Sequence, residues 1–306
     1  MAIEEGRVSE YIFFGSVIID DILQADGQVS MYTLGGSGSH ALMGGRVWSD
    51  DVAFVAGVGQ DFAPEHWDQL ASAGVNLSGM QRFDCVTARA WQLYEDDRRV
   101  EVFRTDIQDL RKMSPQPGPL PTGGRKPKGA YIAAGKVDWL LQWVEILRRA
   151  GVSQILWEPH SQAMSPQHRA EFSEALAKVD IVAPDIDAAM AGYRKKDAQA
   201  IAQAMHEDGA KVVALRMGKR GSLVSESSGA LHQIPMYRTK VADVTGAGNS
   251  YCGGFLVGYT STGDARLAGL YGAISASFVV EQPGLIRWRP TLRAEAEQRL
   301  RELLGQ

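Results

Sequence analysis

A segment near the C-terminal end of the chain carries the groups that hold a small anion. Asp243-Val244-Thr245-Gly246-Ala247-Gly248-Asn249 precedes an apolar run, from Tyr251 to Tyr259, whose spacing fits one face of a helix. Glycines allow a tight turn that brings several backbone N–H groups onto one anion, and a helix N-terminus adds the positive end of its dipole. The segment predicts an anion-binding loop at Gly246, Ala247 and Gly248, although a tight turn before a helix would use the same residues.

Asn249, the first side chain after this loop, limits the chemistry that the loop can support. A carboxylate here could accept a proton from an attacking hydroxyl group, whereas an amide forms hydrogen bonds but is no base at neutral pH. Losing a general base costs about 10²–10⁴-fold in rate, yet phosphoryl transfer depends mainly on positioning and on charge stabilisation. Asn249 is therefore compatible with slow turnover, and it is equally compatible with a structural role as a helix N-cap.

Length and composition favour one large α/β unit in a reducing compartment. The chain has 306 residues, of which 45% are hydrophobic, and a formal net charge of −4, which gives no basic signal for nucleic acid. Two cysteines, Cys85 and Cys252, cannot build a disulfide framework. The first residues lack the pattern of a secretory signal, and the apolar run at 11–19 is too short to span a membrane. We expect a cytoplasmic protein that binds neither nucleic acid nor membranes.

The elements that position the loop are predicted from short apolar runs that alternate with helical patterns. This alternation is typical of a parallel sheet covered on both faces. Residues 87–106 differ, because apolar and polar residues alternate there around a turn at 95–98, which predicts a hairpin. The predicted strands are 11–19, 52–58, 131–134, 154–157, 181–183 and 212–215, and the predicted helices are 64–73, 139–150, 166–178 and 198–208.

The loop segment resembles the signature D-x-T-G-A-G-D of the ribokinase-like (PfkB) carbohydrate kinases, with Asn249 at the position of the catalytic Asp. Asn at this position is also similar to a small eukaryotic branch of the family represented by the yeast killer-virus maintenance protein. Further matches follow in chain order. Phe14 to Asp20 resembles the first strand with its substrate-binding Asp, and Gly35 to Ala41 resembles G-G-x-x-x-N-x-A with His40 at the position of the Asn. Gly57 to Asp61 resembles the G-x-D turn, Trp157-Glu158-Pro159-His160 resembles D-P-N, and Arg216 to Gly221 resembles T-x-G-x-x-G.

The resemblance implies a ribokinase-like three-layer α/β fold with a mostly parallel central sheet and a small β-sheet lid. Residues 1–306 would form a single domain, with lid elements within 11–45 and 84–110. The implied activity is ATP-dependent transfer of the γ-phosphoryl group to a hydroxyl group of a small sugar, nucleoside or related polyol. The implied cofactors are Mg²⁺ and a monovalent cation such as K⁺.

Site residues follow from the same resemblance, position by position. Gly246, Ala247 and Gly248 would form the anion hole beside Asn249. Acceptor binding is assigned to Asp20, Gly35, Gly36, Ser39 and His40, nucleotide binding to Gly218, Gly221, Ala273 and Ser277, and metal binding to Asp185, Asp187 and Asp243.

Departures from the family pattern at positions 249, 188, 160 and 40 keep a second interpretation open. Asn249 replaces the base, and Ala188 stands where the family commonly carries a metal-side Glu, so the acidic turn at Asp185 and Asp187 could be only the solvated start of a helix. The alternative is a catalytically impaired kinase-fold protein that acts by binding a nucleotide or a partner. A dinucleotide site at 36–41 is disfavoured because its glycines lie far beyond the first strand. The edge of an exposed lid favours pairing, which would give a homodimer.

Overall fold

The apolar runs of the sequence form a central sheet. A computed structural model describes residues 9–95, 98–124 and 126–305. Among these residues the sheet has eight strands in the order β14-β13-β12-β11-β10-β9-β1-β4. From β4 to β12 neighbouring strands run parallel, whereas β13 and β14 pair antiparallel at one edge. The strands are β1 Tyr11–Phe14, β4 Val52–Val55, β9 Gly129–Ala134, β10 Gln154–Pro159, β11 Ile181–Val182, β12 Val212–Arg216, β13 Ser222–Glu226 and β14 Leu231–Ile234.

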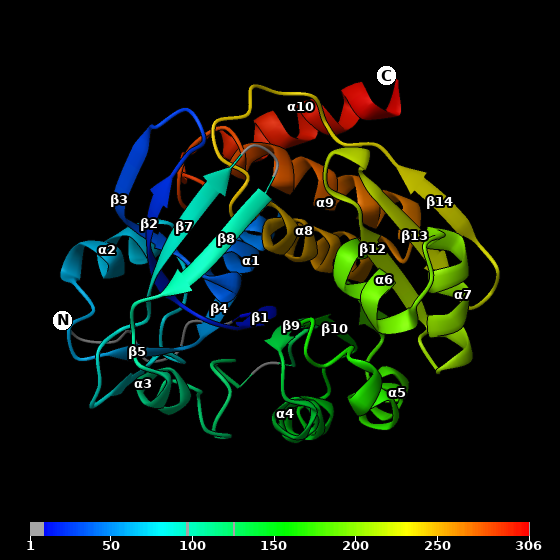
Figure 1. The fold of residues 1–306 in the computed structure, drawn as a ribbon, viewed down its shortest axis with the longest axis horizontal. Helices are drawn as coiled ribbons and strands as arrows, with labels where there is room; N and C mark the ends of the chain where they lie inside the picture. Colours follow the sequence, from blue (N-terminus) through cyan, green and yellow to red (C-terminus); the bar gives the residue numbers. More distant parts are fainter. Residues whose placement is uncertain (1–8, 96–97, 125, 306) are drawn as a thin grey trace.

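Helices cover both faces of this sheet, as the alternating pattern predicts (Figure 1). Tyr11 and Phe13 of β1 belong to the core beneath α1, α8 and α9, whereas Ile12 and Phe14 belong to the core beneath α4, α5 and α7. Successive residues of a strand point to opposite faces, so one buried strand serves both cores. The helices are α1 Ser37–Arg46, α2 Pro64–Ser72, α3 Ile107–Lys112, α4 Val137–Arg149, α5 Arg169–Lys178, α6 Ile186–Tyr193, α7 Ala198–Glu207, α8 Ala247–Thr262, α9 Ala265–Val279 and α10 Leu292–Leu304.

A second sheet forms the lid, with strand order β3-β2-β7-β8. Its strands are β2 Ile18–Leu23, β3 Val29–Gly35, β7 Arg89–Glu95 and β8 Arg98–Phe103. The predicted hairpin is therefore present as β7 and β8, although residues 96–97 of its predicted turn lie outside the described residues. Figure 1 shows β7 and β8 reaching across the N-terminal end of α8.

The prediction of one strand over residues 11–19 is wrong. The run divides into β1, which lies inside the central sheet, and β2, which belongs to the lid. Gly15 lies at the division, where an added Cβ would come within 2.6 Å of the Cα of Gly38. This close approach turns the chain out of the central sheet and carries Asp20 into the lid.

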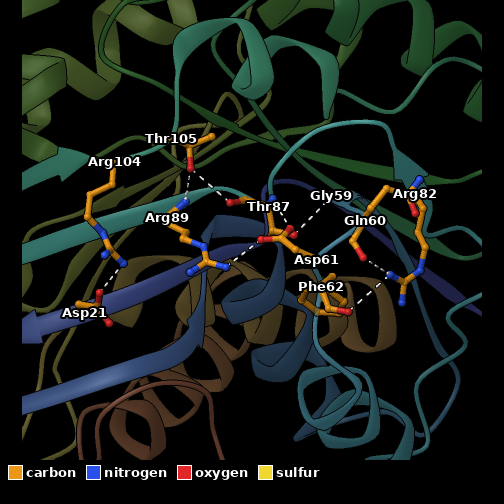
Figure 2. A network of polar contacts seen from close by, with 10 residues as sticks. All are labelled: Asp21, Gly59, Gln60, Asp61, Phe62, Arg82, Thr87, Arg89, Arg104 and Thr105. Carbon is orange, nitrogen blue, oxygen red and sulfur yellow. Dashed lines mark hydrogen bonds and ion pairs between the residues drawn. The ribbon is translucent and has the colours of Figure 1, made fainter.

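A network of polar contacts joins the lid to the G-x-D turn, as Figure 2 shows. Asp61 accepts a hydrogen bond from the backbone N–H of Thr87 at 2.7 Å and pairs with the Arg89 guanidinium at 2.8 Å. Burial alone would raise the pKa of Asp61, but these donors lower it. Arg104, which follows β8, pairs with Asp21 on β2. The structure therefore uses Asp61 and Asp21 to brace the base of the lid.

Two short strands complete the described β structure, β5 Gly57–Gly59 and β6 Gln81–Phe83, which pair parallel beside the lid. None of the helices that the structure describes is long and apolar enough to cross a membrane.

Candidate active site

The anion loop lies at the N-terminal end of α8 and has the backbone conformation that its glycines predict. Gly246 is the N-cap of α8 with φ of 76°, in the left-handed region. A Cβ at this position would lie 2.2 Å from the imidazole ring of His40. The loop is thus held directly against the N-terminal end of α1, which carries His40.

The contact between α1 and α8 depends on close backbone packing further along α8. An added Cβ at Gly253 would lie 1.9 Å from the carbonyl oxygen of Ala41. The Ser250 hydroxyl also donates a hydrogen bond to the carbonyl oxygen of His40 at 3.1 Å. These contacts bring the Gly35 to His40 segment and the anion loop together.

A buried carboxylate lies beside Asn249. The side-chain amide of Asn249 donates to Oε1 of Glu158 at 2.8 Å, and the Arg216 guanidinium pairs with the same oxygen at 2.8 Å. The Tyr131 hydroxyl donates to Oε2 of Glu158 at 2.6 Å. Glu158 of β10 therefore contacts Asn249 in the first turn of α8, and Tyr131 of β9 and Arg216 of β12 both bind Glu158.

The surroundings of this carboxylate fix the charges of its neighbours. Burial raises the pKa of the Tyr131 hydroxyl, and Glu158 raises it further, so Tyr131 is a neutral donor. Burial likewise raises the pKa of the Cys252 thiol on α8. Burial would lower the pKa of Arg216, but Glu158 raises it, so the guanidinium remains charged. Arg216 also reaches the anion loop, because a Cβ added at Gly248 would lie 2.2 Å from its NH1 atom.

Asp20 is buried on strand β2 of the lid, among polar side chains. Its Oδ1 accepts a hydrogen bond from Gln92 at 2.9 Å, and the same amide nitrogen donates to Glu101 at 2.8 Å. Burial raises the pKa of Asp20 to about 7, although the bond from Gln92 opposes this shift. A Cβ at Gly35 would lie 2.0 Å from Oδ2 of Asp20 and 3.5 Å from Nε2 of His40. Asp20 and His40 are therefore close neighbours across Gly35.

His40 and Ser39 present buried polar atoms toward this region. His40 is only 2% exposed and burial lowers its pKa to about 4, so the ring is neutral at physiological pH. Among the described residues, both ring nitrogens of His40 and the hydroxyl of Ser39 lack a hydrogen-bond partner. Buried polar atoms without a partner are costly and commonly mark a place where a ligand supplies one.

The lid also contacts the anion loop through a short chain of hydroxyl groups. The Tyr94 hydroxyl lies 2.6 Å from Oγ1 of Thr245, and Thr245 donates to Oδ1 of Asp243 at 2.8 Å. Burial raises the pKa of Tyr94 to about 12, so it remains protonated and donates to Thr245. Oδ2 of Asp243 is buried and has no partner among the described residues, which fits its predicted role beside a cation.

The residues predicted to bind metal and nucleotide make contacts that helices and turns commonly make. Oδ1 of Asp185 accepts from the backbone N–H groups of Asp187 and Ala188 and so caps α6. Within the described part of the chain no group of three or more His, Cys, Asp or Glu could hold a metal ion. Gly218 opens the turn η2 Gly218–Arg220, which Gly221 ends with φ of 79°. Ala273 and Ser277 are buried one turn apart on α9, where the Ser277 hydroxyl accepts from Arg299 at 2.7 Å.

The sequence analysis missed several polar groups of the site. Gln92 and Tyr94 lie two residues apart on β7 with buried side chains, so the alternation of the hairpin could have assigned both to the inner face of the lid. Glu158 and Arg216 each lie at the end of a strand of the central sheet. The carboxyl ends of parallel strands form the usual ligand-binding edge, and this rule could have placed Glu158 and Arg216 together.

Comparison with known proteins identifies the family of the chain. Residues 10–292 match the pfkB family of carbohydrate kinases. An uncharacterised protein of Schizosaccharomyces pombe is 26% identical and Protein MAK32 of Saccharomyces cerevisiae is 26% identical, each over 90% of this chain and 85% of the relative. These matches confirm that the chain is similar to yeast proteins of the family. A cytidine kinase of Thermococcus kodakarensis is 26% identical over 82% of this chain and 88% of its own length.

Solved structures confirm the ribokinase-like fold. The nucleoside kinase of Methanocaldococcus jannaschii superposes with a TM-score of 0.75 at 20% identity, covering 97% of this chain and 99% of its own. Adenosine kinase from Sinorhizobium meliloti has a TM-score of 0.77 at 22% identity, covering 95% and 99%. Arabidopsis thaliana ribokinase, solved with ribose and ATP, has a TM-score of 0.72 at 19% identity, covering 96% and 99%.

Proposed function

The chain belongs to the pfkB family of carbohydrate kinases, and we propose that it transfers the γ-phosphoryl group of ATP to a hydroxyl group of a small sugar, nucleoside or related polyol. The observation that carries this proposal is the position of His40. Its ring contacts Gly246 of the anion loop and adjoins Asp20 across Gly35. A hydroxyl group bound by Asp20 and His40 would therefore lie next to the loop that would bind the transferred phosphoryl group.

In this reaction the residues of the chain would mainly bind and orient the phosphoryl group and the acceptor. The backbone N–H groups of 246–249 would stabilise the charge on the phosphoryl oxygens, and Arg216 would add a fixed positive charge beside Gly248. Asp20 and the ring nitrogens of His40 would bind hydroxyl groups of the acceptor. Asn249 cannot take the proton of the attacking hydroxyl group, so we expect slow turnover.

ATP is the proposed donor because the family and its structural relatives support it; the ribokinase of A. thaliana was solved with ribose and ATP. Mg²⁺ would bind mainly to the phosphates and to water, with Asp187 as the carboxylate in the first turn of α6. A monovalent cation would bind at the unpartnered Oδ2 of Asp243. The acceptor could be a sugar or a nucleoside, since relatives of both kinds are similar to this chain.

The test is phosphoryl transfer from labelled ATP to a panel of sugars and nucleosides, with Asp20→Asn as the matched variant. We expect one acceptor class to be phosphorylated slowly, and we expect Asp20→Asn to raise KM for that acceptor more than it lowers kcat. Tight ATP binding without transfer to any acceptor would overturn the proposal. That result would instead support the second candidate, an impaired kinase that acts through nucleotide binding, which the amide at Asn249 favours.

A homodimer through the lid is a further part of the proposal. The outer strands of the lid, β3 and β8, carry exposed apolar side chains, among them Val29, Met31 and Phe103. Pairing of two lids would cover them and would satisfy the exposed strand edges. Light scattering on the chain and on Met31→Lys/Phe103→Lys tests this: we expect a dimer that the double substitution converts to a monomer, and a monomeric unmodified chain would refute it.

A further inference from the structure

The hydrogen bond between Asn249 and Glu158 fixes the orientation of the Asn249 amide. An ionised carboxylate can only accept hydrogen bonds, so the group that faces Oε1 of Glu158 at 2.8 Å must be the NH₂ group. The carbonyl oxygen of Asn249 must then point away from Glu158. Position 249 thus presents an acceptor oxygen with a defined orientation, although it carries no negative charge.

Glu158 is itself held in place on both of its oxygens. Oε1 also pairs with Arg216, Oε2 accepts from Tyr131, and the residue is only 6% exposed. Where the D-P-N segment of the family has Asp, Glu158 has a side chain one methylene longer, which extends its carboxylate toward α8. The longer carboxylate at 158 and the amide at 249 therefore complement each other as acceptor and donor.

We propose that Glu158 is a positioning residue, which holds the Asn249 amide with its nitrogen inward so that its carbonyl oxygen accepts a hydrogen bond from the acceptor hydroxyl group. The inference rests on the proposed function for the identity of the hydroxyl group, but the contact between the two side chains is independent of turnover. It assigns position 249 to orientation of the acceptor. It also implies that the site is built for an amide at 249.

The consequence is that Asn249→Asp alone would damage the site rather than restore a base. It would place two carboxylates at hydrogen-bond distance in a buried position, and such a pair cannot both be ionised without a large cost. The groups that face the pair are Tyr131 on β9, Arg216 on β12 and Cys252 on α8, with Asp185 beyond Arg216. Tyr131 and Cys252 stay neutral because burial raises the pKa of each, so Arg216 is the charged group that would offset part of the repulsion.

A double-mutant cycle tests the pairing through thermal unfolding at pH 5.5 and pH 8. We expect Asn249→Asp to lower Tm by roughly 5 °C or more at pH 8 and by less at pH 5.5, where one carboxyl group can hold a proton. Glu158→Gln/Asn249→Asp should recover at least half of that loss, because only one carboxylate then remains in the pair and Arg216 can still neutralise it. An Asn249→Asp variant that is as stable as the unmodified chain at pH 8, or a loss that Glu158→Gln does not reduce, would overturn the proposal.

Asn76→Asp is the matched control, since Asn76 and Asn249 are the two asparagines of the chain. The Asn76 amide donates to Ser9 and to the carbonyl oxygen of Pro121, so its replacement should also lower Tm. Glu158→Gln should not restore this loss. Equal restoration of both variants would show that Glu158→Gln stabilises the protein generally, which would refute a specific pairing.

A direct measurement covers the case in which Asn249→Asp does not fold. Selective ¹⁵N-asparagine labelling gives two side-chain NH₂ groups, and the loss of one in Asn76→Asp assigns the other to Asn249. We expect the Asn249 NH₂ protons to exchange with solvent at least tenfold more slowly than those of a free amide. Exchange at the free rate would refute the proposal. Both tests remain decisive for Glu158 and Asn249 if no acceptor is phosphorylated, which would refute only the proposed function.

Discussion

Replacing Gly246 by alanine should destabilise the protein through two separable costs. The left-handed φ of 76° costs about 1–2 kcal/mol for a residue with a Cβ. The new Cβ would lie 2.2 Å from the imidazole ring of His40, which is fully packed, and such overpacking costs about 1–3 kcal/mol. The sum is about 2–5 kcal/mol, which corresponds to a fall in Tm of about 3–8 °C for a chain of 306 residues.

Gly263 at the other end of α8 is the matched control. It ends the same helix with φ of 68°, but a Cβ added there meets nothing within 4 Å. Gly263→Ala should therefore show only the backbone cost of about 1–2 kcal/mol, or a fall in Tm of about 2–3 °C. The difference between the two variants isolates the contact of the loop with His40.

Thermal unfolding of both variants, with and without His40→Ala, measures this contact. Removing the ring should reduce the cost of Gly246→Ala to nearly that of Gly263→Ala, because only the backbone cost remains. In the transfer assay, Gly246→Ala should lose activity by at least tenfold, since the loop would shift, whereas Gly263→Ala should keep most of it. Equal falls in Tm for the two glycine variants, or no effect of His40→Ala on the difference, would refute the reasoning.

Two further predictions concern the lid. The pKa of Asp20 is about 7 in the folded protein and about 3.8 in the unfolded chain, so the folded state binds more protons between these values and stability falls as pH rises from about 4 to about 7. Asp20→Asn should remove that fall, so that at pH 8 the variant has a higher Tm than the unmodified chain; a parallel pH dependence in both would contradict the assignment. Tyr94→Phe removes the 2.6 Å hydrogen bond from the lid to Thr245. The free energy that holds the lid against the anion loop should fall by about 1 kcal/mol. Hydrogen exchange of residues 89–95 should then be several-fold faster, and unchanged exchange would show that this bond does not hold the lid.

Much of the fold could be predicted because burial leaves a regular pattern in the sequence. β9, β10, β11 and β12 and the helices α2, α4, α5 and α7 lie where apolar spacing placed them. The run at 11–19 was misread because its residues are mostly apolar, and periodicity does not reveal that a chain leaves one buried sheet for another. The cause is a tertiary contact, the approach of Gly15 to Gly38, which leaves no local signal.

The site divides in the same way. The anion loop and the Gly35 to His40 segment were predicted because each carries its own motif of small residues. The partners of Asn249 were not predicted, since Glu158 and Arg216 come from distant strands and meet only after the central sheet forms. Whether Glu158 would reach Asn249 depends on one methylene group and on the crossing of α8 over β10, and no sequence pattern encodes that distance.

The contacts of the residues that depart from the family pattern argue against a random loss of function. Random loss of function would leave buried polar groups unmatched at a cost of about 1–3 kcal/mol each, yet both oxygens of Glu158 are matched, by Asn249, Arg216 and Tyr131. The metal side has no such compensation, because Asp185 is used to cap α6 and Ala188 offers no ligand. If the proposed function holds, the phosphoryl and acceptor side would be arranged around an amide, while the metal side would have fewer ligands. We expect any loss of rate to arise from the missing base at position 249 and from weaker charge neutralisation at the nucleotide, rather than from disorder at Asn249.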